Sequence, residues 1–261
     1  MGIINTSPDS FAGNGVWDQE EAYKLGVQML EDGADLLDVG GESTRPGALP
    51  IGPKEEIRRT APLIKRLRKI TNLPISIDTY KPEVASAALD SGATVINDIY
   101  ASRHPGMLDL LKETDVPVII MHMQGTPKTM QNDPSYDDVR GEIIAFFKKR
   151  IKKLTSAGIN ADRIIIDPGI GFGKRVEDNL TLISYLPELV SLGFPVLVGP
   201  SRKSFIGKVL ALPVEERLAG TLSVLALCVA GGVNYLRVHD VKAACQAVKM
   251  AEAVISAPAY P

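Results

Sequence analysis

Ile164-Ile165-Ile166-Asp167 is the stretch that decides the fold, because three consecutive β-branched residues run directly into a charged one. An uninterrupted apolar run of this kind is typical of a strand that is buried on both faces of a parallel sheet. The same pattern recurs along the chain and predicts eight strands. The runs are 1–4 before Asn5, 36–37 before Asp38, 75–77 before Asp78, 95–96 before Asn97, 118–121 before His122, 164–166 before Asp167, 196–199 before 201–204, and 235–238 before His239.

Segments with helical periodicity separate these runs, among them 20–30, 57–70, 139–154 and 218–229. A glycine follows several of the helical segments, where it can adopt the left-handed conformation that ends a helix. These glycines are Gly33, Gly92, Gly158, Gly193 and Gly232. Eight strand–helix units in a row favour a barrel over an open sheet. The sequence therefore predicts an α/β fold, a single (β/α)8 TIM barrel, in one domain spanning residues 1–261.

Composition narrows the classes of function. The formal net charge of −2 gives no overall basic surface for nucleic acid or an anionic membrane. No apolar stretch reaches the roughly 20 residues that a membrane helix needs, and no signal peptide opens the chain. Cys228 and Cys245 lack the spacing of metal ligands, which favours reduced structural thiols. A cytoplasmic protein that binds neither nucleic acid nor membrane is expected.

Polar residues collect where the predicted strands end, and in a TIM barrel that end carries the active site. These residues are Asn5, Asp38, Asp78, Asn97, His122, Asp167, Lys203, Arg237 and His239. Taken singly, an Asp or Asn after a strand is more often a helix cap or a turn former. His122 is most simply a hydrogen-bonded core histidine. Together they predict a functional site, because every strand delivers a polar group to one end.

The chemistry of these groups falls into two parts. Asp78, Asn97 and Asp167 can accept and donate hydrogen bonds along the flat edge of a nitrogen heterocycle. Arg237 and His239, two residues apart on one strand, face the same way and can meet an anion. Arg45 and Lys203 add positive charge, and 201–204 opens a helix whose free N–H groups favour a carboxylate or phosphate. Transfer of a heterocyclic group with a phosphate leaving group fits this set better than hydrolysis.

Eight motifs in these loops carry a family resemblance. They are NTSPDSF at 5–11, GGESTRPG at 40–47, SIDT at 76–79, IND at 96–98, MHMQGTP at 121–127, DPGIGFGK at 167–174, SRKSF at 201–205 and RVHD at 237–240. In sequence and in order they resemble the dihydropteroate synthases, over nearly the whole chain. The resemblance implies condensation of 6-hydroxymethyl-7,8-dihydropterin diphosphate with p-aminobenzoate, with Mg²⁺ as cofactor and a homodimer as the assembly.

The resemblance also implies a role for each matched residue. The pterin would be held by Asp78, Asn97, Met121, Asp167, Lys203 and Arg237, and the pyrophosphate by Asn5, Thr44, Arg45, Arg237 and His239. p-Aminobenzoate would lie among Phe11, Pro46, Phe172 and Ser204. Asn5 would also lie at the magnesium ion. The residues implied to act in catalysis are Asn5, Asp9, Lys203, Arg237 and His239.

One departure from the family pattern keeps other functions open. After Phe11 the family continues Ser-Asp-Gly-Gly, whereas here 12–15 read Ala-Gly-Asn-Gly, so Gly13 stands at the acidic position. A non-catalytic pterin-binding paralogue is therefore one alternative. A methyltetrahydrofolate-dependent methyltransferase of the same superfamily is another, although it has no use for the pyrophosphate motifs. A metal-dependent hydrolase would need His-x-His on the first strand, where the chain has Ile3-Ile4-Asn5.

Overall fold

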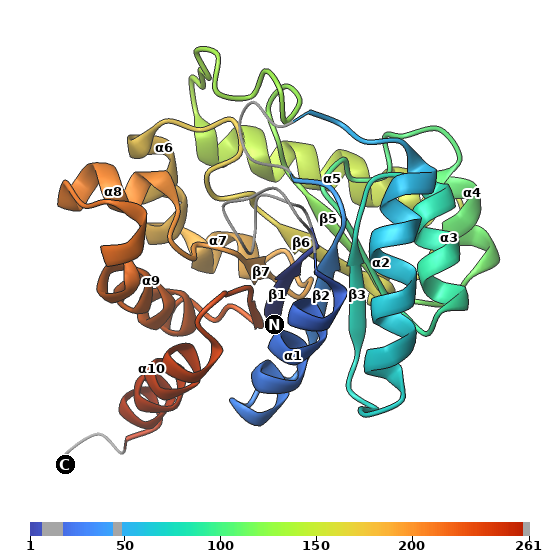
Figure 1. Cartoon of the computed structure of the whole chain (residues 1–261). Coiled ribbons are helices and arrows are strands. Elements are labelled where there is room, and N and C mark those ends of the chain that lie inside the picture. The colour runs from blue at the N-terminus through green and yellow to red at the C-terminus, as the bar shows by residue number, and fades with distance from the viewer. Residues whose placement is uncertain (7–17, 44–48, 258–261) are drawn as a thin grey trace.

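The computed structural model describes residues 1–6, 18–43 and 49–257, and in them strands alternate with helices (Figure 1). The strands are β1 Gly2–Asn5, β2 Leu37–Gly40, β3 Ile75–Asp78, β4 Val95–Asp98, β5 Val118–Met121, β6 Ile164–Asp167, β7 Leu197–Val198 and β8 Tyr235–Leu236. The α-helices are α1 Gln19–Glu31, α2 Pro53–Arg68, α3 Pro82–Asp90, α4 Met107–Glu113, α5 Val139–Ser156, α6 Val176–Ser184, α7 Leu186–Val190, α8 Ser204–Leu210, α9 Leu218–Ala230 and α10 Val241–Ile255. The short 3₁₀ helices η1 Ala161–Arg163 and η2 Val214–Glu216 complete the order. All eight predicted strands are present.

The strands form a closed ring. β1 to β6 pair in parallel in sequence order, and β7 pairs with β8. Parallel bridges join the two sheets at both edges, one between Ile166 and Val196 and one between Gly2 and Val238. At the second edge the N–H of Ile3 donates to the carbonyl oxygen of Val238 at 3.0 Å, and that of Val238 to Met1 at 2.9 Å. The TIM barrel is confirmed, with β7 and β8 shorter than predicted.

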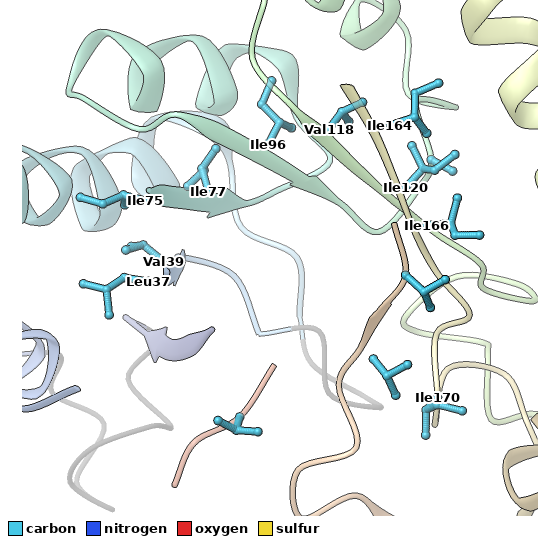
Figure 2. Close-up of a cluster of buried hydrophobic side chains, with 14 of the residues drawn as sticks. Leu37, Val39, Ile75, Ile77, Ile96, Val118, Ile120, Ile164, Ile166 and Ile170 are labelled. Atoms are coloured by element: carbon cyan, nitrogen blue, oxygen red, sulfur yellow. The ribbon is translucent and has the colours of Figure 1, made fainter. Parts of the chain in front are cut away.

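Alternate residues of the strands face opposite sides of this barrel. One set packs outward against the helices, and Figure 2 shows it along β2 to β6. Its labelled members are Leu37, Val39, Ile75, Ile77, Ile96, Val118, Ile120, Ile164 and Ile166, with Ile170 from the loop after β6. The inward set is apolar near the strand starts, where Leu36, Val95, Ile119, Ile165 and Leu197 form a separate cluster. Further along the strands the inward positions are the polar residues of the predicted site.

Helix ends follow local chemistry. The side chain of Asp18 caps α1 by accepting from the N–H of Glu20 at 2.7 Å. Pro53 opens α2, where a missing N–H is harmless. The five predicted helix-ending glycines all have positive φ, from +80° at Gly193 to +105° at Gly92. That part of the sequence prediction is confirmed.

The end of the barrel where the strands begin is apolar. A cavity of about 710 Å³ lies there, lined by the inward cluster of Leu36, Val95, Ile119, Ile165 and Leu197 and by side chains of α10. Asp35, Asn234, Lys249 and Glu252 also line this cavity. Among the helices in 18–43 and 49–257, none is long and apolar enough to span a membrane.

Candidate active site

Arg237 lies at the centre of the polar end of the barrel. Its Nε donates to Asp38 Oδ2 at 2.6 Å, and its Nη2 donates to Asp78 Oδ2 at 2.6 Å. Burial alone would lower the pKa of Arg237, but the carboxylates of Asp38 and Asp78 raise it. The guanidinium therefore stays charged and draws the ends of β2 and β3 toward the chain that follows β8.

Asp38 is a site residue to which the sequence assigned no role. It is fully buried within β2 rather than at its end, and it accepts hydrogen bonds from Ser76 Oγ and from Asn97 Nδ2, the latter at 3.3 Å. It therefore contacts two predicted pterin residues, Arg237 and Asn97. The signal was present, because an acidic residue inside an apolar strand needs a partner when it is buried.

Asp78 and Asp167 are buried carboxyl groups whose charge is balanced differently. Burial raises the pKa of Asp78, and the positive charge of Arg237 opposes that shift. Burial also raises the pKa of Asp167, opposed by the hydrogen bond from the N–H of Gly169 at 2.7 Å and by the charge of Lys203. The carboxylate of Asp167 thus forms a turn, as expected for an Asp that follows a strand. It also lies near the positive charges of Lys203 and Arg237.

Lys203 and Phe172 lie together. The Nζ of Lys203 is 4.1 Å from the centroid of the Phe172 ring and donates to the carbonyl oxygen of Ile170. Burial lowers the pKa of Lys203 to about 7, partly offset by the negative charge of Asp167. The structure therefore brings a residue predicted for the pterin next to one predicted for p-aminobenzoate.

His122 and Lys174 form a buried pair behind Phe172. The Nζ of Lys174 lies 3.1 Å from His122 Nδ1, and burial lowers the pKa of His122 to about 2. The imidazole is therefore neutral and accepts from Lys174, as the interpretation of His122 as a core histidine predicted. Lys174 was missed as a functional residue, because nothing in its sequence surroundings shows that its ammonium group is buried.

The predicted anion end gathers around α8. Ser201 Oγ lies 3.0 Å from His239 Nδ1, which places His239 near the start of the helix. Arg202 forms a bidentate ion pair with Asp240, in which Nε and Nη2 of the guanidinium lie 2.8 and 2.7 Å from the two carboxylate oxygens. Ser204 is the exposed first residue of α8. Lys203 and Ser204 therefore lie at the start of α8, and His239 contacts the residue two before Lys203.

Asn5 ends β1 beside a space that Gly40 leaves open. A Cβ placed on Gly40 would lie 3.7 Å from both Asn5 Oδ1 and Asp78 Oδ2. Asp78 Cβ is nearest to that position, at 3.4 Å, and the side-chain oxygens of Asn5 and Asp78 are of the ligand type that Mg²⁺ requires. Among residues 1–6, 18–43 and 49–257, no group of three or more His, Cys, Asp or Glu side chains is placed to hold a metal.

The six remaining residues of interest, Asp9, Phe11, Gly13, Thr44, Arg45 and Pro46, lie outside the described residues.

A buried lysine holds the described residues on either side of 44–48. Lys81 Nζ donates to Glu42 at 2.7 Å, to Glu56 at 2.5 Å and to the carbonyl oxygen of Ile51 at 2.7 Å. Glu42 in turn accepts from the N–H of Ile51 at 2.8 Å. Sequence reasoning did not identify this cluster, since its members belong to the chain between β2 and α2, to α2 and to the loop before α3.

Comparison with known proteins identifies a family and several relatives of this chain. A family model described as pterin binding enzyme matches residues 1–239. The dihydropteroate synthase of Synechocystis is 47% identical over 97% of this chain and 89% of its own length. That of Escherichia coli is 43% identical, with 98% and 92% covered.

Solved structures agree in fold as well as in sequence. Yersinia pestis dihydropteroate synthase in a sulfonamide drug complex superposes with a TM-score of 0.95, at 40% identity, over 98% of this chain and 94% of that one. The Xanthomonas albilineans enzyme with 4-aminobenzoic acid gives 0.93 at 46% identity, over 99% and 93%. The Xanthomonas enzyme in complex with 7,8-dihydropteroate gives 0.90 at 44% identity, over 99% and 94%.

Proposed function

The chain belongs to the pterin-binding enzyme family and within it to the dihydropteroate synthases, and from this premise we propose how its own residues carry the reaction. The chain is a transferase that joins 6-hydroxymethyl-7,8-dihydropterin diphosphate to p-aminobenzoate, giving 7,8-dihydropteroate and diphosphate. The observation that carries the proposal is the convergence of Asp78, Asn97, Asp167, Lys203 and Arg237 inside one end of the barrel.

The pterin binds among the buried carboxyl and amide groups of β3, β4 and β6. Asp78, Asn97 and Asp167 are all nearly inaccessible to solvent, so hydrogen bonds to them are not weakened by competing water. Met121, also buried and facing inward from β5, supplies an apolar surface for the ring. Arg237 packs beside the ring and directs positive charge toward the diphosphate.

The diphosphate lies toward Asn5 and His239, with Thr44 and Arg45 from the neighbouring loop. Asn5 would be the protein ligand of Mg²⁺, because its side-chain oxygen is of the type that this ion binds. When bound, the ion neutralises negative charge that develops on the departing diphosphate. Asp9 is the acidic residue of this motif that we propose acts in place of the family's acidic group, given Gly13 at that position.

The reaction needs no side-chain nucleophile. The bond between the pterin methylene carbon and the diphosphate oxygen breaks, and the electron-rich pterin stabilises the positive charge left on carbon. The neutral amine of p-aminobenzoate then attacks that carbon and loses one proton. Arg237 and His239 hold the leaving group, while Asp167 and Lys203 keep the ring in register, so catalysis rests on positioning and electrostatics.

p-Aminobenzoate lies against Phe172, with its carboxylate toward Ser204 and with Phe11 and Pro46 completing its surroundings. The Yersinia relative binds a sulfonamide drug and the Xanthomonas relative binds 4-aminobenzoic acid, which supports p-aminobenzoate as a substrate of this chain. Sulfonamides should therefore compete with p-aminobenzoate here. If saturating sulfonamide leaves turnover unchanged at low p-aminobenzoate, this placement is wrong.

The decisive experiment follows dihydropteroate by mass when the purified protein receives both substrates and Mg²⁺. Asp167→Ala should lower kcat/KM at least about 100-fold, because a buried hydrogen bond to a charged group is lost. Asp162→Ala is the matched control, an exposed residue of η1 at the other end of β6. Pterin binding without any product would instead identify a non-catalytic paralogue. Chelation of the metal should abolish product in the wild type, and unchanged turnover would exclude the magnesium assignment.

A cytoplasmic homodimer is the proposed state of the protein. Both cysteines are unpaired thiols, as expected in a reducing compartment. Large apolar side chains are more than half exposed on α9 and α10, namely Leu227, Met250 and Val254. Burial of such side chains between two copies would stabilise a dimer. Light scattering should give twice 28.1 kDa, and a monomer at micromolar concentration would reject the dimer.

A further inference from the structure

The 169–173 segment, which follows β6 and carries Phe172, is held by side chains along its whole length. Each of its five consecutive carbonyl oxygens accepts a hydrogen bond from a side chain. The donors, in order, are Lys174 to Gly169 at 2.9 Å, Lys203 to Ile170, Gln131 to Gly171 at 2.8 Å, Lys174 to Phe172 at 3.0 Å, and Tyr136 to Gly173 at 2.6 Å. Backbone carbonyls outside regular structure are usually satisfied by other backbone groups or water, so this arrangement is a specialised one.

Lys174 makes two of these five bonds and one more. Three acceptors lie within 3.1 Å of Nζ, namely the oxygens of Gly169 and Phe172 and His122 Nδ1, which match the three protons of the ammonium form; burial lowers the pKa of Lys174 to about 7. The side chain is 4% exposed. The segment is thereby fixed to His122, which follows β5, as well as to its own strand.

The backbone conformation of the 169–173 segment requires glycine at three positions. Gly169, Gly171 and Gly173 have φ of +66°, +83° and +59°, the left-handed region that glycine adopts without strain. A Cβ on Gly169 would overlap the carbonyl oxygen of His122. The position of the Phe172 ring therefore depends on how closely this backbone is held against His122.

We propose that Lys174, oriented by His122, is a positioning residue that fixes the Phe172 ring for p-aminobenzoate. Lys174 does not touch the substrate. It acts through the carbonyl groups of Gly169 and Phe172, and the ring of Phe172 also bounds the position of Lys203 Nζ. The inference rests on the proposed placement of p-aminobenzoate beside Phe172.

The test measures KM for p-aminobenzoate, kcat, and the Kd of dihydropterin diphosphate in Lys174→Met. The variant keeps an unbranched chain of similar length and removes all three donors. We expect KM for p-aminobenzoate to rise about tenfold, which corresponds to about 1.4 kcal/mol. Kd for the pterin diphosphate should rise less than KM for p-aminobenzoate, because Asp78 and Asn97 lie on other strands and only Asp167 and Lys203 bond to the segment. His122→Leu, which removes one of the three acceptors, should act in the same direction.

A double-mutant cycle separates positioning from general destabilisation. If Lys174 acts through Phe172, then Lys174→Met should leave KM unchanged in a Phe172→Ala background. Arg163→Met is the matched control, since Arg163 also donates to two backbone carbonyls, of Val116 and Leu111, but at the start of β6. That variant should lower Tm without changing either substrate constant.

The outcomes are distinguishable. If Phe172→Ala alone leaves KM for p-aminobenzoate unchanged, the proposed placement of the substrate is wrong. If Phe172→Ala raises KM but folded Lys174→Met and His122→Leu do not, the placement stands and the positioning role is overturned. Equal fold-changes for Lys174→Met with and without Phe172 would also overturn it. Should Lys174→Met fail to fold, His122→Leu carries the same cycle.

Discussion

Asp38 and Asp78 share the positive charge of Arg237, and Asp38 also accepts from Ser76 and Asn97. Asp38→Asn would place an amide N–H₂ among these donors. The free energy of unfolding should fall by about 2–4 kcal/mol, since a buried ion pair is broken and its partner stays buried. KM for dihydropterin diphosphate should rise, because Arg237 is then held on one side only.

The control for Asp38→Asn is Glu20→Gln. Glu20 also pairs with an arginine, Arg66, at 2.8 Å, but both side chains are more than a third exposed. That change should alter the free energy of unfolding by less than about 1 kcal/mol. Urea denaturation measures the free energy of unfolding of both variants. Equal losses would show that the buried ion pair of Asp38 contributes no more to stability than the exposed pair of Glu20.

Lys203 should give the reaction a pH dependence on its alkaline side. Burial lowers its pKa to about 7, so the free enzyme loses this charge as pH rises through about 7. If the charged form holds the pterin, kcat/KM for dihydropterin diphosphate should fall above that pH. Lys203→Arg keeps its charge and should flatten that decline with the same substrate. A decline that is identical in both proteins would assign it to another group.

The strands and their site residues could be predicted because apolar runs and polar ends follow from burial alone. The strands of the described chain end at or within one residue of the predicted position in β1, β3, β5, β6 and β7. Asp38 was placed at a strand end because a polar residue was taken to stop a strand, whereas its carboxylate is satisfied inside the barrel. The start of α2 at Pro53 was missed by four residues, since its first turn is polar and shows no apolar period.

The supports of the 169–173 segment could not be predicted from sequence. Lys174, Gln131 and Tyr136 bond to groups that lie 52, 40 and 37 residues away in the chain. No local pattern specifies such partners, because they depend on how two loops meet above β5 and β6. The glycines of the segment were visible in the sequence, but their spacing resembles a weak dinucleotide motif as much as a loop of this shape.

Two left-handed glycines make a matched test of this loop. Gly169 and Gly193 have φ of +66° and +80°, but a Cβ on Gly193 meets nothing within 4 Å, whereas one on Gly169 overlaps His122. Gly193→Ala should cost about 1–2 kcal/mol of stability from backbone strain alone. Gly169→Ala should cost about 2–5 kcal/mol and lower kcat/KM at least about tenfold. Denaturant unfolding and the product assay measure both variants. Equal losses of stability would mean that the loop moves to accept a Cβ at Gly169 without cost.

The barrel separates stability from chemistry along its axis. The apolar inward cluster of Leu36, Val95, Ile119, Ile165 and Leu197 lines the cavity at the end where strands begin, and the charged inward residues occupy the other end. The site residues come from several different strands, so their relative positions depend on the ring being closed. Arg237 and His239, which follow β8, reach Asp38 and Ser201 only because their chain is joined to β1 and β7.

The junction between β1 and the chain after β8 can therefore be used to test whether stability and activity depend on closure of the barrel. Val238 donates to Met1 and accepts from Ile3, while its buried side chain faces the helices. Val238→Ala removes only side-chain packing and should lower the free energy of unfolding by about 2 kcal/mol. Val238→Pro also removes the N–H and should cost about 3 kcal/mol more.

The two variants should differ in function as well as in stability. In Val238→Pro the flanking Arg237 and His239 should shift relative to each other, so kcat/KM should fall at least about tenfold. In Val238→Ala kcat/KM should stay within about threefold of the wild type. Hydrogen exchange at the amide of Ile3 reports the junction directly, because that N–H bonds to Val238. It should exchange faster in the proline variant only. Unchanged protection of Ile3 together with full activity in Val238→Pro would show that the remaining pairings hold the active site without this closure.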